Sequence, residues 1–262
     1  MGFEGKVALV TGAAGSIGKG IARRLCELGA DVFITDLDQG KLDEIAAELS
    51  AGPGRCKGLA ADATVGQQVA KVVAACAEAF GGRIDVLVNV AGTVGKGGKV
   101  EEMTEQTWDF VFAVNCKGTF LFVKEAVPLM KAGGRGGKIV NFSSKSGKTG
   151  SALMSAYSAA KAAILGLTQA LAFELAGDRI NVNCVCPGIT MDTGVWQNVS
   201  ADYIQNLGLP KDEVVKKFTS KVPLGRLAKI EDVVAVTVFL ASEGADYMTG
   251  QAINITGGRE MH

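Results

Sequence analysis

The chain has 262 residues, of which 48% are hydrophobic, so it is long enough to bury the core of one large α/β domain. Its 27 basic residues are balanced by 27 acidic residues, and this neutrality argues against a nucleic acid or an anionic membrane surface as a partner. The N-terminus shows neither a basic leader nor an apolar signal core, and no apolar run reaches about 18 residues, which indicates a soluble, cytoplasmic protein.

Short apolar runs rich in β-branched residues alternate with amphipathic helical patterns along the chain. The runs predict strands within residues 6–12, 31–36, 55–62, 84–92, 137–144, 179–188 and 251–258, and the clearest helical patterns cover residues 16–29, 41–50, 65–81 and 155–177. Strands that are apolar on both faces and separated by helices predict an α/β fold. We expect a single domain over residues 1–262 with a Rossmann-type, doubly wound, seven-stranded parallel sheet.

Ligands of such a sheet bind at the carboxyl ends of its strands. Small and polar residues end the predicted strands here, namely Thr11, Gly12, Asp36, Asp62, Asn89, Ser143, Ser144, Pro187 and Gly188. Residues 189 to about 227 lack a strong pattern, and a connection of this length is uncommon unless it covers a site. We therefore expect a cofactor cleft at this edge of the sheet and a loop that covers the substrate.

The turn after the first strand carries glycines at positions 12, 15 and 18, a spacing that differs from the common G-x-G-x-x-G fingerprint. Backbone N–H groups at a helix N-terminus suit a pyrophosphate, although a tight turn without a ligand would use the same residues. Asp36 ends the second strand, where a carboxylate can accept hydrogen bonds from ribose hydroxyls and repel a 2′-phosphate. No basic residue stands beside Asp36, so the sequence favours NAD over NADP.

Tyr157 and Lys161 form the strongest chemical signal in the sequence. Their i, i+4 spacing places both on one helix face, where an ammonium group favours the phenolate and lowers the tyrosine pKa. Tyr157 then serves as a general acid/base, and the Ser144 hydroxyl can orient the reacting oxygen. An isolated pair of this kind is more often packing, but the strand-end residues favour catalysis. His262 is the only histidine, which argues against a Ser-His-Asp hydrolase.

Six cysteines are scattered along the chain without a C-x-x-C pair or companion histidines. They are Cys26, Cys56, Cys76, Cys116, Cys184 and Cys186, and the last two share one face of a predicted strand. We interpret them as buried thiols of a reducing compartment and expect no metal site.

These motifs, in this order, resemble the short-chain dehydrogenase/reductase family over essentially the whole chain. The matching pieces are the turn at 11–18, Asp62 before a helix, "NVAG" at 89–92, "NCKGTF" at 115–120, Ser144, Tyr157, Lys161 and "PG" at 187–188. The resemblance implies an oxidoreductase that interconverts a secondary alcohol and a ketone with hydride transfer to NAD. It also implies a catalytic tetrad of Asn115, Ser144, Tyr157 and Lys161, in which the Asn115 backbone holds a water that links Lys161 to solvent.

The resemblance further implies a set of cofactor contacts. Lys161 binds the nicotinamide ribose, Asp62 with Ala63 meets adenine, and the Ile189 backbone binds the carboxamide. The full expected set is Gly12, Gly15, Ser16, Ile17, Gly18, Asp36, Leu37, Asp62, Ala63, Asn89, Ala91, Gly92, Tyr157, Lys161, Pro187, Gly188, Ile189, Thr190 and Thr193. Family members are usually homotetramers and sometimes homodimers, here expected to pack through the Tyr157 helix and a long helix over residues 108–128.

Three positions depart from the family pattern. Val90 stands where an asparagine commonly braces the sheet, and Asp192 stands where a threonine is usual. Ser16 replaces the middle glycine of the turn, where a positive φ would strain a serine. We therefore expect the bend to shift onto Gly15 and the Ser16 hydroxyl to bond a phosphate oxygen.

The substrate is the least constrained feature. Residues 126–173 contain no Asp or Glu but six Lys and Arg residues. This pattern indicates either a solvent-exposed basic surface or basic residues that bind an anionic group of the substrate. The expected substrate contacts are Ser144, Lys145, Lys148, Met154 and Trp196. The C-terminal sequence resembles family members that act on sugar alcohols, sugar acids or their phosphates.

Two alternatives stay open at this point. A hydroxysteroid or cyclic alcohol would be favoured by a wide apolar pocket made by Trp196, Tyr203, Leu207 and Leu209. A non-catalytic NAD-binding regulatory protein is the alternative from another class, although such a protein needs no proton-transfer residues.

Overall fold

The computed structural model describes residues 2–194, 196, 204 and 210–262. Within these residues, seven parallel strands form one sheet in the order β3-β2-β1-β4-β5-β6-β7. The strands are β1 (Val7–Thr11), β2 (Asp31–Thr35), β3 (Cys56–Gly58), β4 (Val86–Asn89), β5 (Gly137–Phe142), β6 (Ile180–Pro187) and β7 (Ala252–Ile255). All seven predicted strands are confirmed, and the strand order reverses between β1 and β4.

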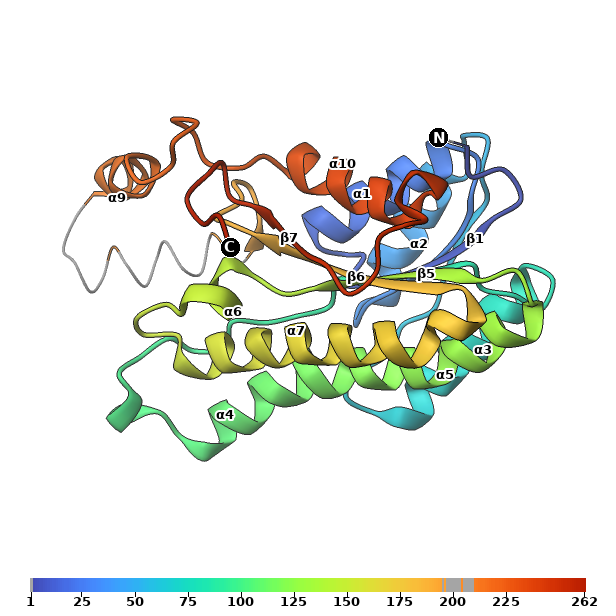
Figure 1. Ribbon diagram of the computed structural model, residues 1–262, viewed down its shortest axis with the longest axis horizontal. Helices are drawn as coiled ribbons and strands as arrows, with labels where there is room; N and C mark the ends of the chain where they lie inside the picture. Colours follow the sequence, from blue (N-terminus) through green and yellow to red (C-terminus); the bar gives the residue numbers. More distant parts are fainter. Residues whose placement is uncertain (1, 195, 197–203, 205–209) are drawn as a thin grey trace.

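Helices cover both faces of the sheet (Figure 1). One layer holds α1 (Ser16–Glu27), α2 (Gln39–Leu49) and α10 (Ile230–Ala241), and the other holds α3 (Gly66–Ala79), α4 (Glu105–Phe112), α5 (Gly118–Gly133) and α7 (Ser155–Leu175). The described residues also form two shorter helices, α6 (Lys145–Thr149) and α9 (Lys211–Thr219), and the 3-10 turns Val100–Glu102, Ala176–Asp178 and Glu243–Ala245. The arrangement is the doubly wound fold predicted from the sequence.

The hydrophobic core lies in two layers, one on each face of the sheet. Successive residues of a strand point to opposite faces, so Ala8 and Val10 of β1 join the cluster under α1 and α10. Val7 and Leu9 of the same strand join the cluster under α3 and α5. Because both faces of the strand are buried, the first four residues of β1 are all apolar, as is typical of a parallel sheet between helix layers.

The long helix expected over residues 108–128 is interrupted. It consists of α4, a π-helical turn η2 (Ala113–Lys117) and α5. The apolar pattern of residues 108–128 does not predict this interruption, because π-helical turns are rare and the sequence here has no marker for one. The turn contains Asn115, which is part of the candidate site.

Helix α7 and the turn after it, Ser155–Asp178, are long and apolar enough by length and composition to cross a membrane. In the fold this helix lies against the sheet beside α4 and α5, and its inner face carries the buried Lys161 (Figure 1). Phe173 on its outer face is 88% exposed, and Phe120 of α5 is 48% exposed. Exposed aromatic side chains on these helices agree with the expected subunit interface, which stays a prediction.

The cysteines are free thiols. Five are buried, and Cys116 is half-buried. Burial raises the pKa of the Cys76 thiol to about 12. The described residues contain no group of three His, Cys, Asp or Glu side chains that could hold a metal ion.

Candidate active site

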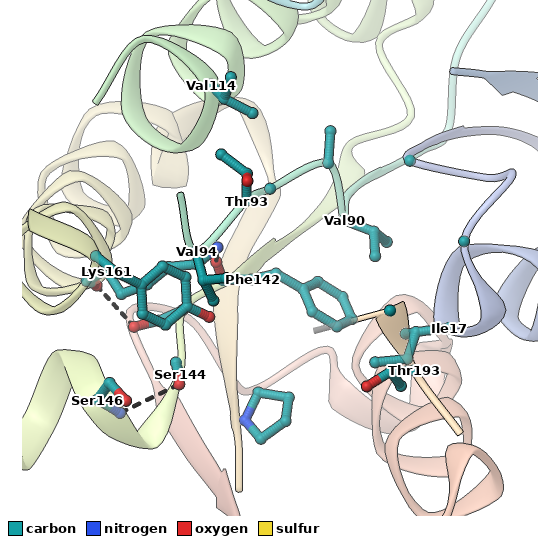
Figure 2. A pocket seen from close by; sticks show the side chains of 18 of the residues that line it. Ile17, Val90, Thr93, Val94, Val114, Phe142, Ser144, Ser146, Lys161 and Thr193 are labelled. Carbon is teal, nitrogen blue, oxygen red and sulfur yellow. Dashed lines mark hydrogen bonds between the residues drawn. The ribbon is translucent and has the colours of Figure 1, made fainter. Parts of the chain in front are cut away.

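A cavity of about 1060 Å³ opens at the carboxyl ends of the strands, next to the reversal of strand order between β1 and β4. Figure 2 shows side chains that converge on it from the turn after β1, the end of β5, α7 and the loop after β6. Every expected cofactor residue except Asn89 lines this cavity, as do Ser144, Lys145, Met154 and Trp196 of the expected substrate residues.

The turn after β1 is built around Gly12. Its φ is +65°, and a Cβ at this position would lie 2.8 Å from the Ala91 nitrogen, so only glycine fits. Gly15 is extended, with φ −80° and ψ 154°, and Ser16 is the first residue of α1. The expected shift of the bend onto Gly15 is therefore wrong, because the left-handed residue is Gly12 and Ser16 needs no positive φ.

The Ser16 hydroxyl has a protein partner. It donates a hydrogen bond of 2.9 Å to the carbonyl oxygen of Asp192, which adopts a left-handed backbone with φ +60°. This contact joins the turn after β1 to the loop after β6, and both segments line the cavity. The expected bond from Ser16 to a phosphate oxygen stays a prediction.

The N-terminus of α1 fits a pyrophosphate. Gly15 caps the helix without a side chain, so no side-chain oxygen occupies the first-turn N–H groups. A Cβ on Gly18 would collide with the Gly12 backbone, which keeps the helix start close to the turn. Such a site favours an anion because the N–H groups and the helix dipole both point at it.

Asp36 lies at the end of β2, as predicted. Its carboxylate accepts hydrogen bonds from the N–H groups of Ala14 at 2.9 Å and Leu37 at 2.7 Å, which fix the carboxylate beside the turn. Asp62 lies further along the same wall, where its Oδ1 accepts from the backbone and hydroxyl of Thr64. The acidic side chains among the described lining residues are these two.

Asn89 does not face the cavity. It is buried in the sheet, and its Nδ2 donates to the Asn141 Oδ1 at 2.9 Å, while Asn141 donates to Thr168. Val90, the next residue, lines the cavity instead, because successive strand residues point in opposite directions (Figure 2). The expected cofactor contact of Asn89 is thus wrong, and this side chain braces β4 against β5.

Tyr157, Lys161 and Ser144 meet at the centre of the cavity. Lys161 is 4% exposed, and its ammonium group donates to the Phe142 carbonyl at 2.8 Å. The same nitrogen lies 5.6 Å from the centre of the Tyr157 ring. Ser144 caps the N-terminus of α6, where its Oγ accepts from the Ser146 N–H at 3.1 Å, and it lines the same cavity as Tyr157.

Burial decides the protonation of both residues. It raises the pKa of Tyr157 to about 12, against the opposing hydrogen bond from Ser144. It lowers the pKa of Lys161 to about 8, against weaker opposing effects of Cys184 and other neighbouring thiols. The predicted lowering of the tyrosine pKa by Lys161 is not found, because loss of solvent around the phenolate outweighs the attraction of an ammonium group that hydrogen-bonds elsewhere.

Asn115 supports the site from behind the cavity wall. From the π-turn its Nδ2 donates to the carbonyls of Val111 and Thr93 at 2.8 Å, and its Oδ1 accepts from the Thr93 N–H at 3.3 Å. Its own carbonyl accepts from the Thr119 hydroxyl at 2.9 Å. A Cβ on Gly92 would lie 2.8 Å from the Asn115 Oδ1 and 3.1 Å from the Lys161 Nζ. Gly92 therefore lets these two side chains approach the end of β4.

Lys148 is not part of the cavity wall. Its ammonium group donates to the Ala252 carbonyl of β7 at 2.8 Å, so its expected contact with the substrate is wrong. Three other basic residues line the cavity and were missed, namely Lys217, Lys221 and Arg259. None belongs to a motif in the sequence, because only the fold brings α9 and the C-terminal segment to Ser144. Tyr203, Leu207 and Leu209 lie outside the described residues.

Comparison with known proteins decides the family. A family model described as enoyl-(acyl carrier protein) reductase matches residues 12–260. The chain belongs to the short-chain dehydrogenase/reductase family. As a family member it is an oxidoreductase with a nicotinamide dinucleotide cofactor, which the glycine turn and the α1 N-terminus fit.

Several members of the family are similar to this chain along their whole length. Galactitol 2-dehydrogenase of Agrobacterium fabrum is 39% identical and is covered completely, as is this chain. Sorbitol-6-phosphate 2-dehydrogenase SrlD of Erwinia amylovora superposes with a TM-score of 0.93 at 36% identity, over 97% of this chain and 100% of that one. The structure of an NAD⁺-bound xylitol dehydrogenase gives a TM-score of 0.92 at 30% identity, over 98% and 99% of the two chains.

Proposed function

We propose that this protein is an NAD-dependent dehydrogenase that reversibly oxidises a secondary hydroxyl group of a polyol, sugar or sugar acid to a ketone. The observation that carries the proposal is the convergence of Tyr157, Ser144 and Lys161 on the cavity that begins at the pyrophosphate turn. The names of the similar proteins support a polyol-type substrate. They include both neutral and phosphorylated polyols, so they leave the charge of the substrate open.

The choice of NAD rests on Asp36. Its carboxylate is held at the end of β2 by two backbone N–H groups, where the adenosine ribose of a dinucleotide is expected. A carboxylate there favours ribose hydroxyls and repels a 2′-phosphate. Neither lysine nor arginine stands next to Asp36 in the sequence.

When bound, the nicotinamide ring supplies the hydride acceptor for oxidation. Ser144 hydrogen-bonds the reacting oxygen, and the Tyr157 oxygen accepts the hydroxyl proton in oxidation and returns it in reduction. Lys161 would bind the nicotinamide ribose, and Asn115 holds the segment after β4 against Lys161. Because burial raises the pKa of Tyr157 to about 12, the phenol is protonated at neutral pH and is ready to act as the acid for ketone reduction.

The test is a screen for NAD⁺ reduction with polyols, sugar acids, their phosphates and a few sterols, using the wild type, Tyr157→Phe and Tyr247→Phe. Tyr247 is fully exposed and lies outside the cavity, so its variant is the matched control. We expect turnover of a polyol-type compound by the wild type and the control. Tyr157→Phe should lose at least a thousandfold in kcat while its NADH affinity stays within twofold.

Other outcomes would contradict the proposal. Retained NADH binding with no turnover on any compound would favour a regulatory NAD-binding protein. Turnover confined to sterols would favour the hydroxysteroid alternative. Turnover by Tyr157→Phe at the rate of the control would exclude the proposed acid/base role.

A further inference from the structure

Four basic side chains from three distant segments line the end of the cavity next to Ser144. Lys145 comes from α6, Lys217 comes from α9, Lys221 follows α9, and Arg259 follows β7. Of the described lining residues, the acidic ones, Asp36 and Asp62, lie at the opposite, cofactor end. The two ends of one cavity thus carry opposite charge.

A buried carboxylate positions two of these cations. The Glu260 Oε1 lies 3.2 Å from the Arg259 Nε and 3.8 Å from the Lys145 Nζ, and the Glu260 side chain is only 8% exposed. Thr256 clamps the same residue, because its hydroxyl accepts from the Glu260 N–H and donates to the Glu260 carbonyl. Glu260 does not line the cavity itself, so it supports the two cations from behind.

Aromatic packing places Lys217 and Lys221 opposite this pair. The Arg259 guanidinium carbon lies 6.0 Å from the centre of the Phe218 ring, and Phe218 packs edge-on against Trp196 with 6.2 Å between ring centres. Lys217 directly precedes Phe218, and Lys221 follows Phe218 by three residues. The four cations therefore line the same cavity, and the charges of Arg259 and Lys221 both act on Lys145.

Among the described residues, ion pairing offsets only part of the positive charge there. The carboxylate that pairs with these cations is Glu260, which offsets one of the four charges. Within the described part of the chain, Lys217 and Lys221 make neither ion pairs nor side-chain hydrogen bonds, and the terminal nitrogens of Arg259 make none either. The Lys145 and Arg259 side chains are only 13% and 19% exposed, so bulk water solvates these two cations poorly, whereas Lys217 and Lys221 are exposed. Burial, and then the charge of Arg259, lower the pKa of Lys145.

We propose that Lys145, Lys217, Lys221 and Arg259 form a substrate subsite that binds a phosphate monoester carried by the hydroxy compound. A dianion matches the uncompensated charge, and guanidinium and ammonium groups are the usual partners of phosphate. Since Lys145 follows Ser144 directly, the subsite and the serine that meets the reacting oxygen belong to the same part of the cavity wall. This inference rests on the proposed function and narrows it to phosphorylated substrates.

The kinetic test compares sorbitol with sorbitol 6-phosphate in the wild type, in the double variant Lys217→Met with Lys221→Met, and in Lys216→Met. Lys216 is exposed on the same helix but does not line the cavity, so its variant controls for the loss of a surface charge. We expect the wild type to prefer the phosphate. The double variant should raise KM for sorbitol 6-phosphate at least tenfold, with less than twofold change for sorbitol and for NAD⁺.

The subsite is wrong if the wild type prefers sorbitol, or if KM rises equally for both polyols. A rise confined to NAD⁺ would assign the lysines to the cofactor instead. An effect of the same size in Lys216→Met would show that only the overall surface charge matters.

A binding measurement separates the subsite from the proposed reaction. Inorganic phosphate is titrated calorimetrically into the NADH-saturated protein, with gluconate as the carboxylate probe. We expect phosphate to bind the wild type and Lys216→Met equally, and the double variant at least tenfold more weakly. Absence of phosphate binding to the wild type, or tighter binding of gluconate, would overturn the phosphate subsite. Intact phosphate binding without turnover of any polyol would instead count against the proposed function.

Discussion

Replacing Lys161 with methionine tests whether burial of this cation costs stability. The substitution keeps the length of the side chain but removes the charge and the hydrogen bond to the Phe142 carbonyl. Burial lowers the Lys161 pKa from 10.5 to about 8, a difference that corresponds to about 3 kcal/mol of unfavourable free energy when the lysine is protonated. The lost hydrogen bond opposes this gain by about 1–3 kcal/mol. We therefore expect Lys161→Met to be inactive yet at least as stable as the wild type at pH 7.

The pH dependence isolates the charge from the hydrogen bond. Below pH 8 the folded and unfolded wild type both hold the lysine proton, so the penalty is fully present. Between about pH 8 and 10.5 the unfolded chain binds more protons than the folded one, and the stability of the wild type therefore rises with pH. The variant has no such group at this position. Its stability relative to the wild type should thus fall by about 1 kcal/mol between pH 7 and pH 9.

The assay is urea unfolding of the wild type, Lys161→Met and Lys216→Met at both pH values, without cofactor. Lys216 is exposed, so its variant should show no change relative to the wild type between pH 7 and pH 9. Parallel pH profiles of the wild type and Lys161→Met would refute the reasoning, because they would mean that Lys161 titrates as it does in water.

Three further substitutions test the cofactor and catalytic contacts. Asp36→Ala removes the carboxylate beside the turn. We expect the kcat/KM preference for NAD⁺ over NADP⁺ to fall about a hundredfold, which corresponds to about 3 kcal/mol. An unchanged ratio in steady-state kinetics would contradict the role of Asp36 in selecting NAD⁺. Ser16→Ala removes the hydrogen bond to the Asp192 carbonyl, which contributes about 1 kcal/mol. We expect NADH release, measured by stopped-flow fluorescence, to become about fivefold faster. Equal or slower release would show that this contact does not retain the cofactor. Gly92→Ala places a Cβ 2.8 Å from the Asn115 Oδ1, and we expect kcat to fall more than tenfold. A kcat near that of the wild type would mean that Asn115 and Lys161 can move aside.

The sequence predicts the fold well because its strands are buried on both faces. The pattern of β1, for example, is apolar at Val7, Ala8, Leu9 and Val10, so both faces of this strand are apolar, whereas a helix with one solvent-facing side would carry polar residues there. The strand-end rule then places Asp36 and Ser144 on one cavity, where the structure also has them, and Tyr157 reaches the same cavity from α7. These predictions succeed because the carboxyl edge of a parallel sheet follows directly from the order of the strands.

The failures concern the direction of single side chains and contacts between distant segments. The sequence predicts Asn89 at the cavity, but this residue hydrogen-bonds within the sheet and Val90 lines the cavity instead. A shift of one residue along a strand turns a side chain to the other face of the sheet. Lys148 bonds to β7, more than a hundred residues away, which no local pattern shows. Arg259 stands beside Lys145 only after β7 has joined the sheet edge.

The wall of the carboxyl-end cavity comes from segments that are synthesised far apart in time. The turn at Gly12 and the strands β1 to β5 leave the ribosome first, and Tyr157 and Lys161 follow on α7. Lys217, Lys221 and Arg259 come last, and because a domain generally folds as a unit, the cavity is complete only when β7 has joined the sheet. A chain that stops before β7 therefore lacks part of the cavity wall, although it already holds the turn at Gly12, Tyr157 and Lys161.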